Sequence, residues 1–141
     1  MIKKVAILAN GGDVAGFNAV IRGIVKTAEN NNVECYGFID GYNGLLKNEY
    51  ERLSTAENGN AEGILQKGGS IIGSSTNANV FNYKVTNEDG TVEYKDLSDV
   101  CVENIKKDEF DCIFTLGGDG TQKSARDFAT KGVNVIGVPK T

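Results

Sequence analysis

The stretch from residue 5 to residue 28, VAILANGGDVAGFNAVIRGIVKTA, determines the fold class of this chain. Its first five residues form a continuous apolar run, which is typical of a strand buried on both faces of a parallel sheet. A glycine-rich segment follows, and apolar residues then recur at the spacing of a helix: Phe17, Val20, Ile21, Ile24, Val25 and Ala28. Strand, loop and helix in this order predict the first half of a βαβ unit.

The same alternation continues to the end of the chain. Strand-like runs lie at 33–39, 110–116 and 133–138, and helical patterns at 98–107 and 122–131. Asp96 or Ser98 is the candidate N-cap of the first of these helices, and Gly132 closes the second. We therefore expect an α/β fold, a Rossmann-like sheet of mostly parallel strands with helices on both faces.

The middle of the chain is less regular. Segments 81–85 and 91–95 flank an Asn-Glu-Asp-Gly turn and predict a β-hairpin insertion near 77–95. A short helix is expected from about residue 60 to before Gly68, and a turn-rich loop at 40–44.

Composition excludes several classes of protein. The chain has 141 residues, a net charge of −4, 18 glycines, three cysteines and no histidine. Its length predicts one domain, and the missing histidine excludes Ser-His-Asp and HExxH chemistry. The negative charge argues against a nucleic-acid partner, and no stretch reaches the ~18 apolar residues of a membrane span. The cysteines form no CxxC pair, so we expect reduced, mostly buried thiols and a cytoplasmic location.

Three glycine-rich loops, at 10–18, 68–75 and 117–121, are assigned to the carboxyl edge of the predicted sheet, and the first and third of them directly follow predicted strands. Ligands of open parallel sheets bind at the carboxyl ends of the strands, where these loops should meet. Adjacent glycines followed by a helix N-terminus favour a phosphate, and Asp119 among them then fits as a ligand of a Mg²⁺ ion that bridges to phosphate oxygens. In the alternative, Asp119 is only the N-cap of a tight strand-to-helix turn. Neither a Walker A pattern nor GxGxxG is present.

Smaller features favour structural roles. Asn18, in the first turn of its helix, is interpreted as a cap-like residue rather than a ligand contact. Arg22 and Lys26 share one helix face, which is usually solvated but can also bind an anion. Tyr36 and Tyr42 are residue types that pack more often than they stack on nucleotides.

Several ordered motifs resemble the N-terminal half of the catalytic domain of 6-phosphofructokinases, and they run over nearly the whole chain. They are Lys3–Leu8, Gly11–Asp13, Gly16, Asn18–Gly23, Asp40–Leu45, Gly68–Ser70, Gly73–Ser75, Gly117–Thr121 and Ile136–Thr141. The hairpin segment 77–95 falls outside the resemblance and is similar to an insertion.

The resemblance implies phosphoryl transfer from ATP to the 1-hydroxyl of fructose 6-phosphate, with Mg²⁺, in the intact protein. It implies this ATP-binding set: Gly12, Tyr42, Ser75, Thr76, Gly118, Asp119, Gly120 and Thr121. Asp119 would be the metal ligand, Thr141 would begin the sugar-phosphate segment, and Arg22 with Lys26 would match part of an effector site. It also implies a cytoplasmic homo-oligomer, a dimer or tetramer, with no nucleic-acid or membrane partner.

Two positions bear on the phosphoryl donor. Pyrophosphate-using relatives typically carry an aspartate where this chain has Gly120, so glycine favours ATP. Lys140 is usual in pyrophosphate users but also occurs in ATP users. Thr76 and Asn77 stand where many relatives carry a phosphate-clamping arginine.

The end of the chain matters for activity. In the family, Pro-Lys-Thr leads into Ile-Asp-Asn-Asp, whose first aspartate is the general base, and this chain stops at Thr141. Residues 1–141 are therefore expected to be the nucleotide-binding portion, inactive alone and prone to self-association through exposed apolar surface. The alternatives are another GGDGT kinase of the NAD kinase or diacylglycerol kinase type, a pyrophosphate-dependent phosphofructokinase, and a non-catalytic nucleotide-binding module. The first loop, with Asn18–Gly23, speaks against the other GGDGT kinases.

Overall fold

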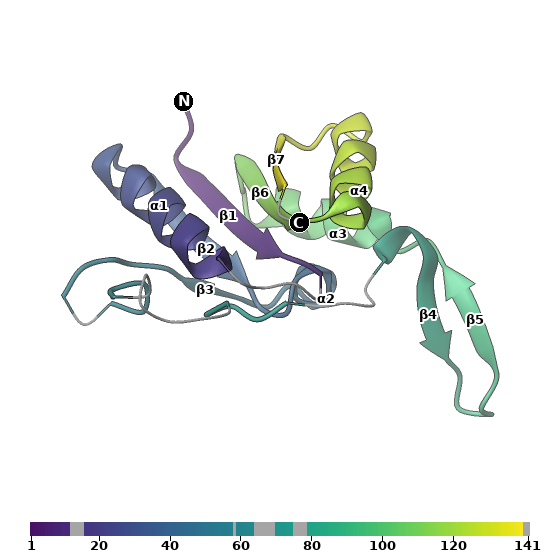
Figure 1. Ribbon diagram of the computed structural model, residues 1–141. Helices are drawn as coiled ribbons and strands as arrows, with labels where there is room; N and C mark the ends of the chain where they lie inside the picture. The colour runs from purple at the N-terminus through teal and green to yellow at the C-terminus, as the bar shows by residue number, and fades with distance from the viewer. Residues whose placement is uncertain (12–15, 58, 64–69, 75–78, 140–141) are drawn as a thin grey trace.

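The centre of the molecule is a five-stranded sheet in the order β3-β2-β1-β6-β7 (Figure 1). The structure, a computed structural model, describes residues 1–11, 16–57, 59–63, 70–74 and 79–139. In chain order the strands are β1 (Lys4–Ala9), β2 (Glu34–Phe38), β3 (Tyr50–Arg52), β6 (Cys112–Gly117) and β7 (Val135–Pro139). β1 pairs in parallel with β2 and β6, and β6 with β7, whereas β3 is an antiparallel edge strand. The predicted fold of mostly parallel strands with helices is confirmed.

Helices cover both faces of this sheet. They are α1 (Phe17–Asn30), α2 (Tyr42–Lys47), α3 (Ser98–Lys107) and α4 (Asp119–Thr130). Side chains alternate along β1, so Val5, Ile7 and Ala9 join the core under α1. Ala6 and Leu8 join the core formed with α2, α3 and α4. The continuous apolar run of β1 is thus buried on both sides, as its sequence predicts.

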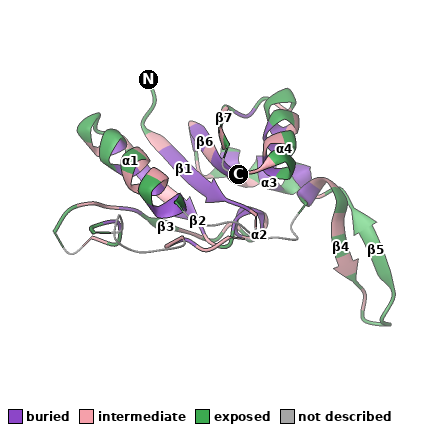
Figure 2. Ribbon diagram, in the orientation of Figure 1, coloured by how far each residue is buried: buried purple, intermediate pink, exposed green. Residues whose placement is uncertain are grey.

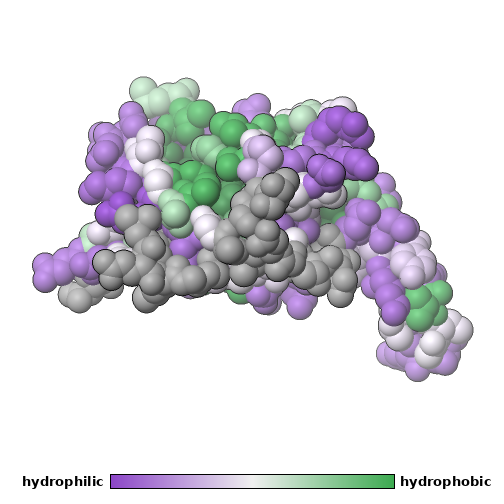
Figure 3. All heavy atoms as spheres, viewed as in Figure 1, coloured by the Kyte–Doolittle hydropathy of each residue, from purple (hydrophilic) through white to green (hydrophobic). Residues whose placement is uncertain are grey.

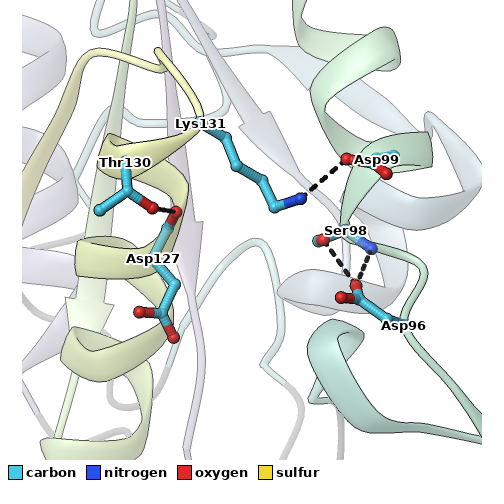
Figure 4. Close-up of polar contacts among 6 residues, drawn as sticks. All are labelled: Asp96, Ser98, Asp99, Asp127, Thr130 and Lys131. Carbon is cyan, nitrogen blue, oxygen red and sulfur yellow. Dashed lines mark hydrogen bonds and ion pairs between the residues drawn. The ribbon is translucent and has the colours of Figure 1, made fainter.

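Polar contacts stabilise the three-helix face, which is the side of the sheet covered by α2, α3 and α4. Lys131, just after α4, forms an ion pair of 2.8 Å with Asp99 in the first turn of α3 (Figure 4). Beside it, Asp96 accepts hydrogen bonds from the backbone N–H (3.0 Å) and hydroxyl (2.6 Å) of Ser98. The N-cap of α3 is nevertheless Leu97, not the predicted Asp96 or Ser98, so Asp96 acts one position before the cap.

The predicted hairpin forms a separate two-stranded sheet and is confirmed. It consists of β4 (Tyr83–Thr86) and β5 (Val92–Lys95), preceded by the 3₁₀ helix η2 (Val80–Asn82). The hairpin extends away from the body of the molecule, and most of its surface is exposed (Figures 1 and 2).

The prediction of a loop at 40–44 is wrong, because α2 begins at Tyr42. Its apolar spacing rests on Tyr42, Leu45 and Leu46, and six residues are too few for a clear helical period. Edge strand β3 was not predicted, since the exposed Glu51 and Arg52 give it no apolar pattern. α4 begins at Asp119 rather than at residue 122, because the low helix propensity of Gly120 conceals the first turn. Of the short helix expected near residue 60, residues 60–63 form turns and 64–69 lie outside the described residues.

The cysteines fit the expectation of reduced, buried thiols. Cys35, Cys101 and Cys112 are free and buried. Burial raises the pKa of the Cys35 and Cys101 thiols to about 12, so both stay protonated near neutral pH. Among the described residues, no helix combines the length and the apolar character needed to cross a membrane.

Candidate phosphate-binding site

Two long helices begin at the carboxyl edge of the sheet without a side-chain cap. α1 (14 residues) follows β1 with Gly16 as N-cap, and α4 (12 residues) follows β6 with Gly118 as N-cap. Neither N-cap residue supplies a side-chain hydrogen bond to its helix. The first N–H groups of a helix have no partner inside it, and the helix dipole adds partial positive charge there. The edge is therefore suited to an anion.

The loop after β6 brings backbone close to backbone. A Cβ on Gly117 would lie 2.4 Å from the carbonyl oxygen of Asn10 and 2.5 Å from Oγ1 of Thr121, so only glycine fits there. Asp119 is the first helical residue and is exposed. The alternative in which Asp119 is the N-cap of the turn is therefore wrong, and its carboxylate remains available to a ligand.

Side-chain hydrogen bonds join the three glycine-rich loops. The hydroxyl of Thr121 donates to the carbonyl oxygen of Asn10 (3.3 Å), linking the third loop to the first. Ser74 donates to the carbonyl oxygen of Gly11 (2.9 Å), linking the second loop to the first. The described parts of all three loops thus meet at one edge, as expected from the sequence.

Asn18 has a structural role in this arrangement. Its side chain is buried at 3% exposure, and its Oδ1 accepts a hydrogen bond of 2.7 Å from the backbone N–H of Ile71. Asn18 therefore fixes the second loop against α1, in agreement with its interpretation from the sequence as a structural residue.

Tyr42 lies at the same edge but is packed inside. It is 1% exposed, its ring stacks on Phe128 with centroids 5.9 Å apart, and its hydroxyl donates to the carbonyl oxygen of Thr121 (3.3 Å). Burial raises the pKa of this hydroxyl well above its ordinary value, although a hydrogen bond with Ser124 opposes the shift. Tyr42 is thus a neutral donor that supports the first turn of α4, and contact with a nucleotide stays a prediction.

The other predicted site residues fall into two groups. Gly12, Ser75, Thr76 and Thr141 lie outside the described residues, as does Lys140. Arg22 is partly exposed and Lys26 exposed on α1, beyond its first turn, so they do not line the edge formed by the loops.

A magnesium ion fits the residues present only together with a phosphorylated ligand. No group of three or more His, Cys, Asp or Glu side chains among the described residues could hold a metal alone. Mg²⁺ in nucleotide sites is commonly held by one or two carboxylates and by phosphate oxygens. The exposed carboxylate of Asp119, in the first turn of α4 and at its uncapped N-terminus, matches that pattern.

Two residues of the site were not predicted from the sequence. Gln122 donates from Nε2 to the carbonyl oxygens of Gly117 (3.1 Å) and Thr115 (3.3 Å), which fixes the turn into α4. Asn10 is 8% exposed, and its Oδ1 has no hydrogen-bond partner among the described residues. The sequence marks neither residue, because the contacts of Gln122 and the burial of Asn10 arise only when the chain is folded.

The parallel sheet, the glycine N-caps of α1 and α4 and the exposed Asp119 at the carboxyl edge are features typical of phosphate-binding α/β proteins. Comparison with protein families narrows the class, since the phosphofructokinase model matches residues 4–141. The chain belongs to the phosphofructokinase family.

Relatives of known function support the same assignment. The chain is 50% identical to ATP-dependent 6-phosphofructokinase 2 of Clostridium perfringens (strain 13 / Type A), over 99% of this chain and 38% of that protein. It is 37% identical to ATP-dependent 6-phosphofructokinase 3 of Bacteroides thetaiotaomicron, over 98% of this chain and 39% of that protein. The chain therefore spans less than two fifths of the length of these relatives.

Solved structures share the fold. The T-state phosphofructokinase of Pichia pastoris superposes with a TM-score of 0.80 at 23% identity, covering 100% of this chain and 15% of that one. The pyrophosphate-dependent phosphofructokinase of Marinobacter aquaeolei gives a TM-score of 0.73 at 23% identity, covering 99% of this chain and 34% of that one.

Proposed function

We propose that this chain is the ATP- and Mg²⁺-binding part of an ATP-dependent 6-phosphofructokinase, which phosphorylates fructose 6-phosphate to fructose 1,6-bisphosphate in glycolysis. The observation that carries the proposal is the turn at Gly117–Thr121, which opens α4 with uncapped N–H groups beside the exposed Asp119. The names of the relatives at 50% and 37% identity support ATP as the donor.

In this proposal the chain positions the donor. Backbone N–H groups at the start of α4 bind phosphate oxygens, and Asp119 holds the Mg²⁺ that neutralises charge on the phosphates. Tyr42 and Gln122 hold the turn in shape through their hydrogen bonds to Thr121 and Gly117. Gly12, Ser75 and Thr76 complete the ATP site, and Thr141 begins the sugar-phosphate site.

The space at Gly120 supports ATP over pyrophosphate. A Cβ built on Gly120 meets no atom of the described residues within 4 Å, so the helix surface is open where a larger donor needs room. An aspartate there would crowd the space that the α-phosphate of ATP needs, whereas pyrophosphate has no third phosphate to place.

Isothermal titration of the chain with ATP tests the site. Mg-ATP should bind to the unmodified chain, and chelation of Mg²⁺ should weaken that binding. Asp119→Ala should lower the affinity for Mg-ATP at least about tenfold, or ~1.4 kcal/mol. Asp127→Ala is the matched control, because Asp127 lies in the last turn of the same helix and should not matter. Equal affinities of the two variants would contradict a role for Asp119 in binding.

Gly120→Asp tests the choice of donor without unfolding the chain. The added side chain has room, and an aspartate in the first turn of a helix stabilises it by about 0.3–1 kcal/mol. The variant should keep its thermal midpoint and lose affinity for Mg-ATP relative to Mg-pyrophosphate. If the unmodified chain already binds pyrophosphate more tightly than ATP, the family's pyrophosphate-dependent chemistry is the better assignment.

Catalysis is proposed for the whole protein and not for this chain by itself. The expected aspartate base is not among residues 1–141, so a coupled assay of this chain with ATP and fructose 6-phosphate should show no turnover. The intact protein is proposed to be a cytoplasmic homo-oligomer whose effector site includes Arg22 and Lys26. A longer protein that includes this chain can be assayed with different phosphoryl acceptors. Phosphorylation of fructose 6-phosphate would separate it from other GGDGT kinases. No turnover with any acceptor would favour a non-catalytic nucleotide-binding module.

A further inference from the structure

The β4–β5 hairpin exposes apolar side chains on β5, whose second edge pairs with no other strand of the described residues. Every residue of β5 is exposed, and Val92 and Tyr94 are 47% and 61% exposed (Figures 2 and 3). The described contacts anchor the hairpin at its base, where Tyr83 donates to Oδ1 of Asn43 (3.2 Å) and the N–H of Leu97 donates to the carbonyl oxygen of Val80 (2.7 Å). An isolated two-stranded hairpin is only marginally stable in water, so a further strand would stabilise this one.

The free edge of β5 presents the backbone groups of its two apolar residues. The N–H of Asn87 donates across the hairpin to the carbonyl oxygen of Thr91 (2.8 Å). Hydrogen-bonded and non-hydrogen-bonded pairs alternate along an antiparallel ladder. From the register of β4 and β5, Val92 and Tyr94 therefore turn their N–H and C=O groups away from β4.

The geometry points to pairing of β5 with β5 of a second copy of this chain, antiparallel and with the two-fold axis at Tyr94. The two Tyr94 residues then exchange backbone hydrogen bonds. In the same register Glu93 of each copy lies opposite Lys95 of the other copy. Opposite charges in cross-strand pairs stabilise a sheet, so the edge is complementary to itself.

The charges also disfavour the neighbouring registers. An axis at Glu93 would place the two glutamates opposite each other, and an axis at Lys95 would do the same with the lysines. Charged side chains on a short edge strand usually prevent strand pairing. Here Glu93 and Lys95, which form an ion pair of 2.9 Å within one copy, instead favour the register with the axis at Tyr94 over the two registers with an axis at Glu93 or Lys95. The occupant favoured by the sequence of β5 is therefore another β5.

Disulfide cross-linking tests this register directly. The native cysteines are buried, so a cysteine introduced on the hairpin is the reactive thiol in the unmodified background. Tyr94→Cys should give a disulfide-linked dimer under mild oxidation, because residues in a directly opposite hydrogen-bonded pair have Cα atoms about 5.5 Å apart. Val92→Cys on the same edge and Thr86→Cys on β4 are matched controls and should cross-link at least about tenfold more slowly. Equal rates for the three variants would overturn the proposal.

A charge exchange provides the second test, by analytical ultracentrifugation of the whole chain. Glu93→Lys alone and Lys95→Glu alone should each weaken self-association at least about fivefold, because each places like charges opposite one another. An equimolar mixture of the two variants should associate again, since the lysines of one then face the glutamates of the other. Association that persists in each variant, or that does not return in the mixture, would show that another surface joins the copies and would overturn the proposal.

Discussion

The two faces of the central sheet are covered very differently. One face lies under α2, α3 and α4, whereas on the other face α1 is the one helix of the described residues, with Leu53, Ala61 and Ile72 packed beside it. The uncovered part over β1, β6 and β7 is a groove of about 590 Å³, and Figure 3 shows apolar side chains gathered there. Its lining includes Ile2, Val5, Ile24, Cys112, Phe114 and Ile136.

The direction of the crossovers explains the difference. The step from β1 to β2 and the step from β6 to β7 run toward opposite edges of the sheet. Because βαβ crossovers are right-handed, α1 and α4 must lie on opposite faces. In the part of the chain that the structure describes, the crossover from β1 to β2 through α1 is the one that lies on this face. The order of the strands, and not a lack of apolar residues, therefore leaves half of the face open.

The largest expected effect on the free energy of unfolding is found by comparing Ile113 and Phe114, adjacent residues of β6 whose side chains point to opposite faces of the sheet. Ile113 is 2% exposed under the three helices, and Phe114 lines the open groove. Ile113→Ala should lower the free energy of unfolding by about 2–5 kcal/mol, since the cavity it leaves is enclosed. Phe114→Ala should cost clearly less, because Phe114 is only partly buried and the space that its ring leaves opens into the groove. Urea unfolding of both variants measures the difference, and equal losses would show that the two faces are equally packed.

The two faces also show what the sequence could predict. The strand β1, the helix α1 and the junctions between strand and helix were predictable, because apolar period and glycine position are local signals. Edge strand β3 was not, since pairing with β2 and not its own pattern defines it. The convergence of the first and third loops followed from their places directly after strands β1 and β6. The packing of Tyr42 on Phe128 and the contacts of Gln122 depend on residues that only the folded chain brings together.

A smaller effect on stability but a clear effect on surface chemistry is expected at Ile136. This residue is 49% exposed at the rim of the groove. Ile136→Lys should reduce binding of a hydrophobic dye and self-association through this face, with a change in unfolding free energy of about 0.5 kcal/mol or less. Val100→Lys is the control, because Val100 is 40% exposed on α3, away from the groove. Equal loss of dye binding in both variants would show that the groove is not the main apolar surface of the molecule.

The smallest effect is expected at the rim of the three-helix face, where Asp108 joins the end of α3 to the end of α2. The side-chain amide of Asn48 donates to Oδ2 of Asp108 (2.9 Å), and this hydrogen bond is the main cause that holds the pKa of the Asp108 carboxyl below its usual range. A carboxyl group with a lowered pKa in the folded state contributes stability above its pKa in the unfolded chain, and that contribution is lost as the pH falls through the folded value. Asp108→Asn should therefore be slightly less stable than the unmodified chain at pH 7, and the difference should shrink as the pH falls below about 4. Midpoints of urea unfolding measured from pH 7 to pH 3 should show the stabilities of the two proteins converge. A difference that stays constant with pH would mean that packing, and not the charge of Asp108, stabilises this rim.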